Sequence, residues 1–304
     1  MKNAIDIQDL TKRYGKLTAL DHVTFSVPEG SLFGLIGPDG AGKTTLYQLL
    51  TTLLSPDEGS ATVAGLDVVK DFRKLRTEIG YMPERFSLYP DLTVRENLHF
   101  FASLFGVDVK DNFDLIAPIF SQLEKFPNRR AGALSGGMKQ KLALSCALIH
   151  RPKVLLLDEP TTGVDAVSRS EFWDMLAALK TQGITILVST SYMDEAERCE
   201  RIALLHKGKV LDVNTPAELI KRTDKHLYNA SATQMYPLLE ALRTLPGVKD
   251  CYTFGATLHV VTEEAFNPDE AAGRLRREGL TDTRIWPAQG NIEDLFIKLA
   301  QNDD

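Results

Sequence analysis

Residues 37–45 form a glycine-rich run that contains one lysine and two threonines. In order, they are Gly37, Pro38, Asp39, Gly40, Ala41, Gly42, Lys43, Thr44 and Thr45. Their spacing matches the phosphate-binding loop pattern, in which glycines let backbone N–H groups converge on an anion without obstruction by side chains. In such a loop Lys43 reaches the β- and γ-phosphates, and the Thr44 hydroxyl ligates Mg²⁺ beside phosphate oxygens. The run therefore predicts a site for ATP and Mg²⁺.

The flanking residues favour this interpretation over an ordinary glycine-rich turn. Residues 32–36 form an apolar run typical of a buried strand, and a helix is expected from about residue 42 to 54. A strand before the loop and a helix after it are the context that the pattern requires. The positive end of the helix dipole adds a further attraction for phosphate.

Two carboxylates follow a second apolar run, residues 154–157. Asp158 and Glu159 thus stand at the carboxyl end of a predicted strand, the edge at which parallel sheets bind ligands. We expect Asp158 to hold the Mg²⁺ shell. Glu159 points the other way along an extended chain, where it can take a proton from an attacking water. On their own the two residues could equally be surface charge, but beside a phosphate loop they indicate phosphoryl transfer.

A third string, residues 134–140, contains a serine followed by two glycines. Ser135 is placed to cap a helix that Gly136 and Gly137 open, and Gln140 ends the string. A helix start of this kind is a second anion-binding site, although it could also serve only as a cap. Most proteins with a phosphate loop have no such string.

Composition favours an ordinary globular protein without a nucleic-acid partner. The 304 residues carry a net charge of -6 with a pI near 5.6, and Lys and Arg are scattered, whereas nucleic-acid binding needs a basic face. Cys146, Cys199 and Cys251 are widely spaced, which favours a reducing interior over a disulfide framework. Because no apolar run approaches the roughly 18 residues needed to span a bilayer, we expect any membrane role to come from a partner.

The pattern of strands and helices predicts two domains. Residues 1–224 are expected to form an α/β domain around a doubly wound, largely parallel sheet, with a helical insertion at about 88–150 where apolar residues recur at helical spacing. Residues 225–304 follow a charged linker and show the order strand, helix, hairpin, helix, strand, helix. That order resembles a ferredoxin-like split βαβ unit, an α+β fold.

The three strings together resemble the nucleotide-binding subunit of an ABC transporter, a P-loop NTPase, over residues 4–222. The resemblance implies that 134–140 is the family's signature, which in one subunit closes over the ATP held by the phosphate loop of another. It also implies that Tyr14 stacks on adenine and that Asp165 belongs to the loop through which the two subunits communicate. An ATPase activity, a second ABC ATPase subunit and a membrane-spanning permease are therefore expected.

Two positions depart from the family pattern. Glu84 stands where the family places a glutamine that touches Mg²⁺ and the attacking water, and Ser191 where it places a histidine that bonds the γ-phosphate. A carboxylate can still ligate Mg²⁺, but two unit charges about 5 Å apart repel by roughly 3 kcal/mol at an effective dielectric constant of about 20. Losing one donor to a developing anion typically costs about 10²–10³ in rate. Asp39 adds another charge, so we expect a weak catalytic site that retains Glu159.

The expected function is the ATPase subunit of an exporter at the cytoplasmic face of the cell membrane, weak at its own site but with an intact signature. A heterodimer is favoured, with a homodimer as the alternative. Residues 86–94 resemble the family's contact with the permease or are local core; with 192–197 and 294–297 they resemble the drug, lipid or polysaccharide export branch. Two other interpretations stay open, an ATP-binding dimer clamp without turnover and a soluble ABC ATPase outside transport.

Overall fold

The computed structural model describes residues 2–303, with side chains as far as residue 301. The chain divides into two compact units, residues 1–216 and 217–304, which we call unit 1 and unit 2. Sequence analysis placed the domain boundary at residue 224, after the short helix α7 (Pro216–Ile220), whereas the division by contacts falls at the start of that helix. Each unit has a hydrophobic core of its own.

Unit 1 begins with an antiparallel sheet of four strands in the order β2-β1-β4-β5. These strands are β1 (Asn3–Tyr14), β2 (Leu17–Pro28), β4 (Glu58–Val63) and β5 (Leu66–Asp67). Buried and accessible side chains alternate along much of β2, as expected for a strand with one face on a core. Tyr14 pairs with Leu17 at the tip of the β1–β2 hairpin, so its ring stands at the end of the sheet.

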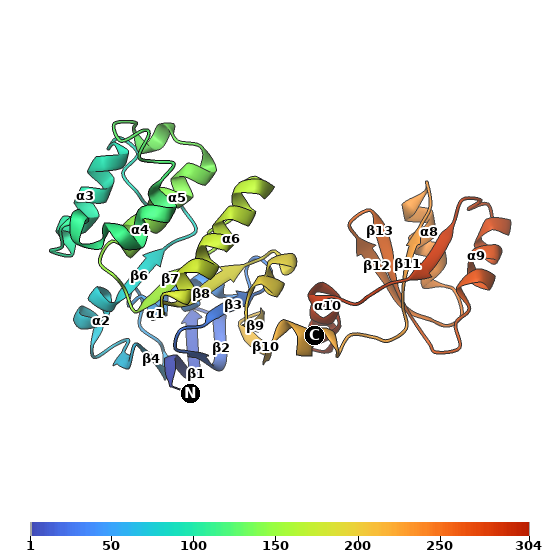
Figure 1. The fold of residues 1–304 in the computed structure, drawn as a ribbon. Coiled ribbons are helices and arrows are strands. Elements are labelled where there is room, and N and C mark those ends of the chain that lie inside the picture. Colours follow the sequence, from blue (N-terminus) through green and yellow to red (C-terminus); the bar gives the residue numbers. More distant parts are fainter. Residues whose placement is uncertain (1, 304) are drawn as a thin grey trace. The chain divides into compact units, whose positions relative to one another are not determined.

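The central sheet of unit 1 has six strands in the order β10-β9-β3-β8-β7-β6 (Figure 1). Its strands are β3 (Leu32–Ile36), β6 (Ile79–Met82), β7 (Val154–Leu157), β8 (Thr185–Thr190), β9 (Arg201–His206) and β10 (Lys209–Asn214). All neighbours pair in parallel except β9 and β10. Every residue of β3, β7 and β8 is buried, as is typical of parallel strands covered on both faces. The predicted doubly wound α/β sheet is confirmed, and the carboxyl ends of these strands meet at one edge.

One hydrophobic core contains residues of both sheets of unit 1 and of the first helix. The main helices around the sheets are α1 (Lys43–Leu50), α2 (Phe72–Glu78) and α6 (Ala166–Thr181). Leu46, Leu49 and Leu50 of α1 lie in the same core as Phe25 and Phe33, whose rings stack with centroids 5.6 Å apart. Because α1 is packed into this core, the loop between β3 and α1 has a fixed position.

Helices occupy the chain between β6 and β7, the green part of Figure 1. They are α3 (Val94–Leu104), α4 (Phe113–Phe120) and α5 (Gly136–Leu148), with the 3-10 turns η1 (Val109–Asn112) and η2 (Ala131–Ala133). A capping box starts α3, since the Thr93 hydroxyl accepts from the Glu96 amide while the Glu96 carboxylate accepts from the Thr93 amide. No helix among residues 2–303 is both long enough and apolar enough to cross a membrane.

Unit 2 is built on a four-stranded antiparallel sheet in the order β12-β13-β11-β14. Along the chain its elements are β11 (Leu227–Ser231), α8 (Met235–Arg243), β12 (Val248–Phe254), β13 (Thr257–Thr262), α9 (Pro268–Arg277), β14 (Arg284–Pro287) and α10 (Ile292–Asp303). The first and third of its strands lie at the centre of the sheet, which is the predicted ferredoxin-like arrangement. In Figure 1, α8 and α9 lie on one side of this sheet and α10 on the other.

A buried carboxylate attaches the last helix of unit 2 to the sheet. Asp294 of α10 accepts hydrogen bonds from the Tyr252 hydroxyl at 2.8 Å and from the Asn291 amide at 2.8 Å. It also pairs with Nδ1 of His259, and both side chains are almost fully buried. Burial and the neighbouring Asp294 raise the pKa of Tyr252, which therefore stays a hydrogen-bond donor. The hydrogen bonds of Asp294, Tyr252 and His259 described here all lie within unit 2. This cluster therefore indicates a structural role.

Candidate functional site

The phosphate-binding loop connects β3 directly to α1, and its backbone tolerates only glycine at two points. A Cβ atom on Gly37 would lie 2.2 Å from the Leu205 carbonyl oxygen, closer than any real contact. Gly42, the N-cap of α1, has a φ of 105° and would bring a Cβ to 2.5 Å from the Ala19 carbonyl oxygen. The loop is therefore held between the β1–β2 sheet and β9, with the start of α1 at its end.

The ammonium group of Lys43 lies inside this loop. Its Nζ atom donates to the carbonyl oxygens of Gly37 at 2.7 Å and Pro38 at 2.9 Å. It also forms an ion pair with Oε1 of Glu159 at 2.9 Å, and both side chains are buried. All three donors of the ammonium have acceptors, so the charge is held in place with little conformational freedom.

Asp158 lies at the carboxyl end of β7 and is fully buried. Its Oδ1 accepts a hydrogen bond of 2.7 Å from the Ser189 hydroxyl, whereas its buried Oδ2 has no partner among the described residues. Burial raises the pKa of Asp158; the hydroxyls of Ser189 and Thr44 oppose that rise, and the negative charges of Glu159 and Glu84 add to it. A buried carboxylate oxygen without a partner favours the binding of a cation.

Glu159 has a strained backbone and three side-chain partners. Its φ is 50°, in the left-handed region that costs a residue with a Cβ about 1–3 kcal/mol and is common at functional sites. Besides Lys43 on Oε1, its Oε2 accepts from the Thr162 hydroxyl at 2.9 Å and the Ser191 hydroxyl at 3.3 Å. The carboxylate is thus directed at Lys43 of the phosphate loop.

Lys43 and Glu159 line one cavity of about 830 Å³, a size within the usual range for small-molecule sites, whereas Asp158 is not among its lining residues. The predicted site residues that line it are Tyr14, Asp39, Gly40, Gly42, Lys43, Thr44, Thr45, Glu84, Glu159 and Ser191. Tyr14 is 45% exposed, so its ring is accessible at the end of the β1–β2 hairpin. The structure therefore brings the phosphate loop, the base candidate and both departures from the family pattern to one place.

The signature string does not line that cavity. Ser135 caps α5 by accepting from the Met138 amide at 3.4 Å, and Ser135 and Gly136 are exposed. Gly137 and Gln140 instead face the start of α6, where a Cβ on Gly137 would lie 2.7 Å from the Ser168 hydroxyl. The exposed start of α5 is available to a ligand that another molecule carries.

Asp165 caps α6 with its carboxylate. Its Oδ1 accepts from the amides of Val167 at 3.1 Å and Ser168 at 3.0 Å. These hydrogen bonds, that of Ser168 first, hold the pKa of Asp165 below its usual value. The loop from Glu159 to Asp165 therefore ends on a fixed helix start.

The chain has oxygens that fit Mg²⁺ but no site made of side chains alone. Among the described residues, no group of three or more His, Cys, Asp or Glu side chains could hold a metal ion. Mg²⁺ in nucleotide sites takes one or two protein oxygens together with phosphate oxygens and water. Asp158 Oδ2 and the Thr44 hydroxyl fit that role, with Glu84 near enough for its charge to act on Asp158.

Ser189 is the site residue that sequence analysis missed. Its hydroxyl donates to Asp158 Oδ1 and accepts from the Glu159 amide at 2.9 Å, so it holds both carboxylate residues. The signal in the sequence was a hydroxyl near the end of a buried strand. Its meaning depends on the register that sets Leu157 of β7 beside Val188 of β8.

Two comparisons of sequence find similar proteins. A family model described as ABC transporter matches residues 20–162. The chain is 40% identical over 301 residues to "Probable multidrug ABC transporter ATP-binding protein YbhF" of Escherichia coli (strain K12), covering 97% of this chain and 52% of that protein. It is 38% identical over 304 residues to "Nod factor export ATP-binding protein I" of Bradyrhizobium diazoefficiens, covering 98% of this chain and 96% of that protein. The chain thus spans about half the length of the first relative and nearly all of the second.

Solved structures with the same fold are also found. One is described as "Structure of ATP binding subunit of ABC transporter", with a TM-score of 0.66 and 29% identity over 72% of this chain and 92% of that chain. Another is a dimeric ATP-binding cassette, MJ0796, in a post-hydrolysis state bound to ADP and Pi, with a TM-score of 0.62 and 26% identity over 69% of this chain and 98% of that chain. The similarity to both covers a part of the chain about as long as unit 1.

We expect Asp158→Asn to raise the midpoint of thermal unfolding in the presence of EDTA. Since burial raises the pKa of Asp158, the ionised carboxylate costs stability at pH values above that pKa, and the cost disappears as pH falls below the ordinary aspartate range. The advantage of the variant should therefore shrink at acid pH. The same variant should lose most of the extra stabilisation that Mg²⁺ adds to ATP, because it lacks a charged metal ligand.

The matched control is Asp174→Asn, at an exposed aspartate of α6. It should change neither the unfolding midpoint in EDTA nor the extra stabilisation by Mg²⁺ appreciably. A lower midpoint for Asp158→Asn in EDTA, or an unchanged effect of Mg²⁺, would contradict the role assigned to Asp158.

Proposed function

The chain belongs to the ABC transporter family, and on that premise we propose that it is the ATP-binding subunit of an exporter, coupling ATP binding and hydrolysis to transport by a separate permease. The observation that carries the proposal is the ion pair of Lys43 and Glu159 in one cavity of about 830 Å³ at the carboxyl edge of the parallel sheet, with the fully buried Asp158 preceding Glu159. ATP hydrolysis is the general activity of this family. The names of the relatives, which include multidrug and Nod factor export proteins, support the exporter branch.

The side chains account for the steps of hydrolysis. Lys43 and the amides of the phosphate loop bind and orient the β- and γ-phosphates. Phosphate oxygens compete with Glu159 for the Lys43 ammonium, and a Glu159 released from that ion pair can accept the proton of the attacking water. Asp158 and Thr44 would hold Mg²⁺, which would supply charge neutralisation at the phosphates.

A second cassette would complete the site. In this chain the exposed start of α5 at Ser135 is separate from the cavity of Lys43, so it is free to cover nucleotide held by another subunit. Its capped, glycine-opened amides suit an anion. The dimeric state of the similar cassette MJ0796 agrees with such an assembly. We favour a heterodimer, because Glu84 and Ser191 in this cavity depart from the family pattern. A catalytically competent site on the partner would compensate for the weak site of this chain.

An apolar groove of about 550 Å³ supports docking of the permease. It lies between α3, α5 and the strand β6, and its apolar members include Leu53, Leu88, Phe101, Leu104 and Phe105. Leu104 is 65% exposed and Leu53 58%, an unusual exposure for leucine unless another surface covers them. A cytoplasmic loop or helix of a membrane-spanning subunit is the occupant we propose, which would hold the chain at the cytoplasmic face of the membrane.

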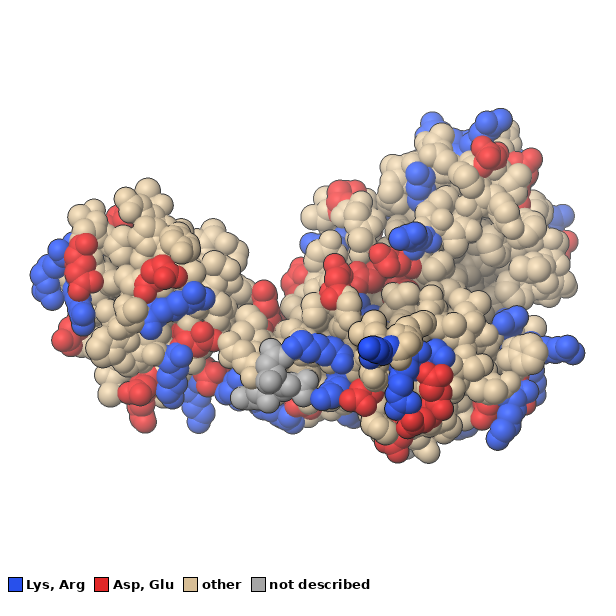
Figure 2. Space-filling model, turned by 180° about the vertical axis from the view of Figure 1, so that it is seen from behind, with Lys and Arg blue, Asp and Glu red and all other residues tan. Residues whose placement is uncertain are grey.

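The visible surface gives no support for a nucleic-acid partner. On the face drawn in Figure 2, Lys and Arg side chains of the described residues are interspersed with Asp and Glu. A nucleic-acid backbone requires a continuous basic surface. The permease and the second cassette therefore remain the partners that we propose.

The geometry also supports a weak site in this chain. The Ser191 hydroxyl is engaged with the Glu159 carboxylate at 3.3 Å, so it does not supply the donor to phosphate that a longer imidazole would. Glu84 adds a negative charge whose effect already reaches Asp158. These two features also support the second candidate function, an ATP-binding clamp that stabilises the dimer without turnover.

Glu84→Gln combined with Ser191→His should raise kcat of the full chain by at least about tenfold. The double variant removes one charge near the phosphates and restores a donor whose loss typically costs about 10²–10³ in rate. Steady-state phosphate release checks this, with Glu84→Gln plus Ser191→Ala as the control that lacks the donor. Equal rates for the two double variants would contradict our account of the weak site.

The purified chain alone should hydrolyse ATP slowly, and adding the second cassette should raise the rate well beyond the sum of the two. Ser135→Arg in this chain should abolish that stimulation, since it obstructs the exposed start of α5, and should leave binding of ATP to this chain intact. Rapid turnover by the isolated chain would remove the heterodimer from consideration. Failure of the pair to associate with vesicles that contain the permease would count against the transport function.

A further inference from the structure

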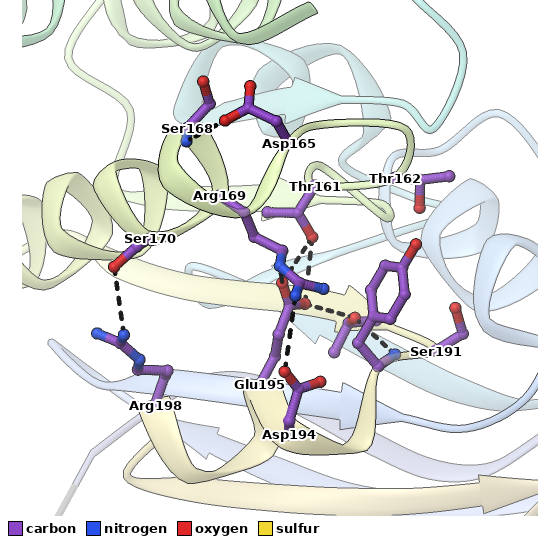
Figure 3. Close-up of polar contacts among 12 residues, drawn as sticks. Thr161, Thr162, Asp165, Ser168, Arg169, Ser170, Ser191, Asp194, Glu195 and Arg198 are labelled. Carbon is purple, nitrogen blue, oxygen red and sulfur yellow. Dashed lines mark hydrogen bonds and ion pairs between the residues drawn. The ribbon is translucent and has the colours of Figure 1, made fainter. Parts of the chain in front are cut away.

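Besides Asp158 and Glu159, a further buried carboxylate contacts the chain segments that form the nucleotide cavity. Glu195 belongs to the 3-10 turn η3 (Met193–Arg198) and is 4% exposed. Its carboxylate accepts from the Thr161 hydroxyl at 2.9 Å and 3.1 Å and from the Thr190 hydroxyl at 2.6 Å (Figure 3). We call Glu195, Thr161 and Thr190 the Glu195 clasp.

Each threonine of the clasp is followed by a residue that contacts Glu159. Thr162, next to Thr161, donates to Glu159 Oε2 at 2.9 Å, and Ser191, next to Thr190, donates to the same oxygen at 3.3 Å. Two segments far apart in sequence are therefore linked twice, once through Glu195 and once through Glu159. The two carboxylates hold the segments at neighbouring positions.

The clasp also fixes the turn that carries Ser191. The Thr190 hydroxyl donates to Glu195 and accepts from the Tyr192 amide at 3.0 Å. Tyr192 and Ser191 both line the nucleotide cavity. A change at Thr190 would therefore alter the path of the backbone through Ser191, although Thr190 itself is buried and 1% exposed.

Arg169 connects the clasp to the first turn of α6. Its Nε lies 3.8 Å from Glu195 Oε1, and its guanidinium carbon lies 4.8 Å from the centre of the Tyr192 ring. The Arg169 amide donates to the Asp165 carbonyl oxygen at 2.9 Å. The helix start that ends the Glu159–Asp165 loop is thus in electrostatic contact with the buried Glu195.

We propose that Glu195 is a positioning residue for ATP hydrolysis, which holds Thr162 and Ser191 against Glu159 and ties them to the start of α6. The proposal rests on the proposed ATPase function. A carboxylate suits this role because both of its oxygens only accept, so it satisfies two hydroxyl donors at once. With its partners in place, Glu159 keeps a strained backbone and a fixed side-chain direction, and small displacements of a catalytic group are costly.

Paired variants at the two threonines of the clasp test the proposal in the full chain. Thr161→Val and Thr190→Val remove a hydroxyl but keep the shape of the side chain, whereas Thr161→Ser and Thr190→Ser keep the hydroxyl. We expect the valine variants to lower kcat by about 10- to 100-fold with KM for ATP changed by less than about twofold. The serine variants should retain most of the activity. Arg198→Ala is the control, because the Arg198 guanidinium donates hydrogen bonds to Asp174 and Ser170 of α6 and none of these bonds involves the clasp.

Hydrogen exchange gives a second measurement that needs no turnover. In the valine variants, peptides that span 159–165 and 189–195 should exchange faster, because the Tyr192 amide and the loop after Glu159 lose their support. Unchanged exchange together with unchanged kcat would overturn the proposal. An equal fall in kcat for valine and serine variants, with a lower unfolding midpoint in both, would also overturn it, since the effect would then be one of packing. If the unsubstituted chain shows no turnover even beside the second cassette, the proposed ATPase function fails, and the exchange rates alone then decide whether Glu195 holds the two segments.

Discussion

The charges buried at the carboxyl edge of the parallel sheet constrain the rest of unit 1. Lys43 and Glu159 are paired out of water, and the neighbouring Asp158 keeps one carboxylate oxygen without a partner among the described residues. Burying such groups costs several kcal/mol for each ion before pairing and hydrogen bonds offset it. A fold that carries this cost at one edge is arranged for a ligand that brings anionic oxygens and a cation. The strained backbone of Glu159 at the same place leads to the same conclusion.

The surrounding strands and helices hold Lys43, Asp158 and Glu159 in fixed positions near one another. The parallel register of β7 and β8 brings Ser189 to the residues that follow β7, where its hydroxyl donates to the Asp158 carboxylate and accepts from the Glu159 amide. The core around α1 fixes the phosphate loop on the other side. Beyond this edge, the Glu195 clasp joins the loop after β7 to the end of β8 through buried threonines. The site therefore consists of loops that follow β3, β7 and β8. These strands hold the loops in place because every one of their residues is buried.

The sequence was sufficient for the parts of the fold that local patterns specify. The phosphate loop, the apolar strands at 32–36 and 154–157 and the order of elements in the second domain each have a local cause, and the structure has them. Ser189 and Glu195 could not be found in this way, because their roles arise only when β8 pairs with β7. In the sequence alone, Glu195 looks like one of several solvated charges, because Asp194, Glu197 and Arg198 lie beside it, whereas the structure buries it. The separation of Ser135 from the cavity likewise depends on how α5 packs against α6, which no local pattern sets.

Calorimetric titration of ATP into the full chain, with Mg²⁺ and with EDTA, tests most directly whether the buried charges form a nucleotide site. We expect saturable binding that Mg²⁺ strengthens. Lys43→Met combined with Glu159→Gln, which removes both members of the ion pair so that neither is left as a buried charge without the other, should weaken binding by at least about tenfold, or about 1.4 kcal/mol. Absence of binding by the unsubstituted chain, or equal binding by the double variant, would contradict the account.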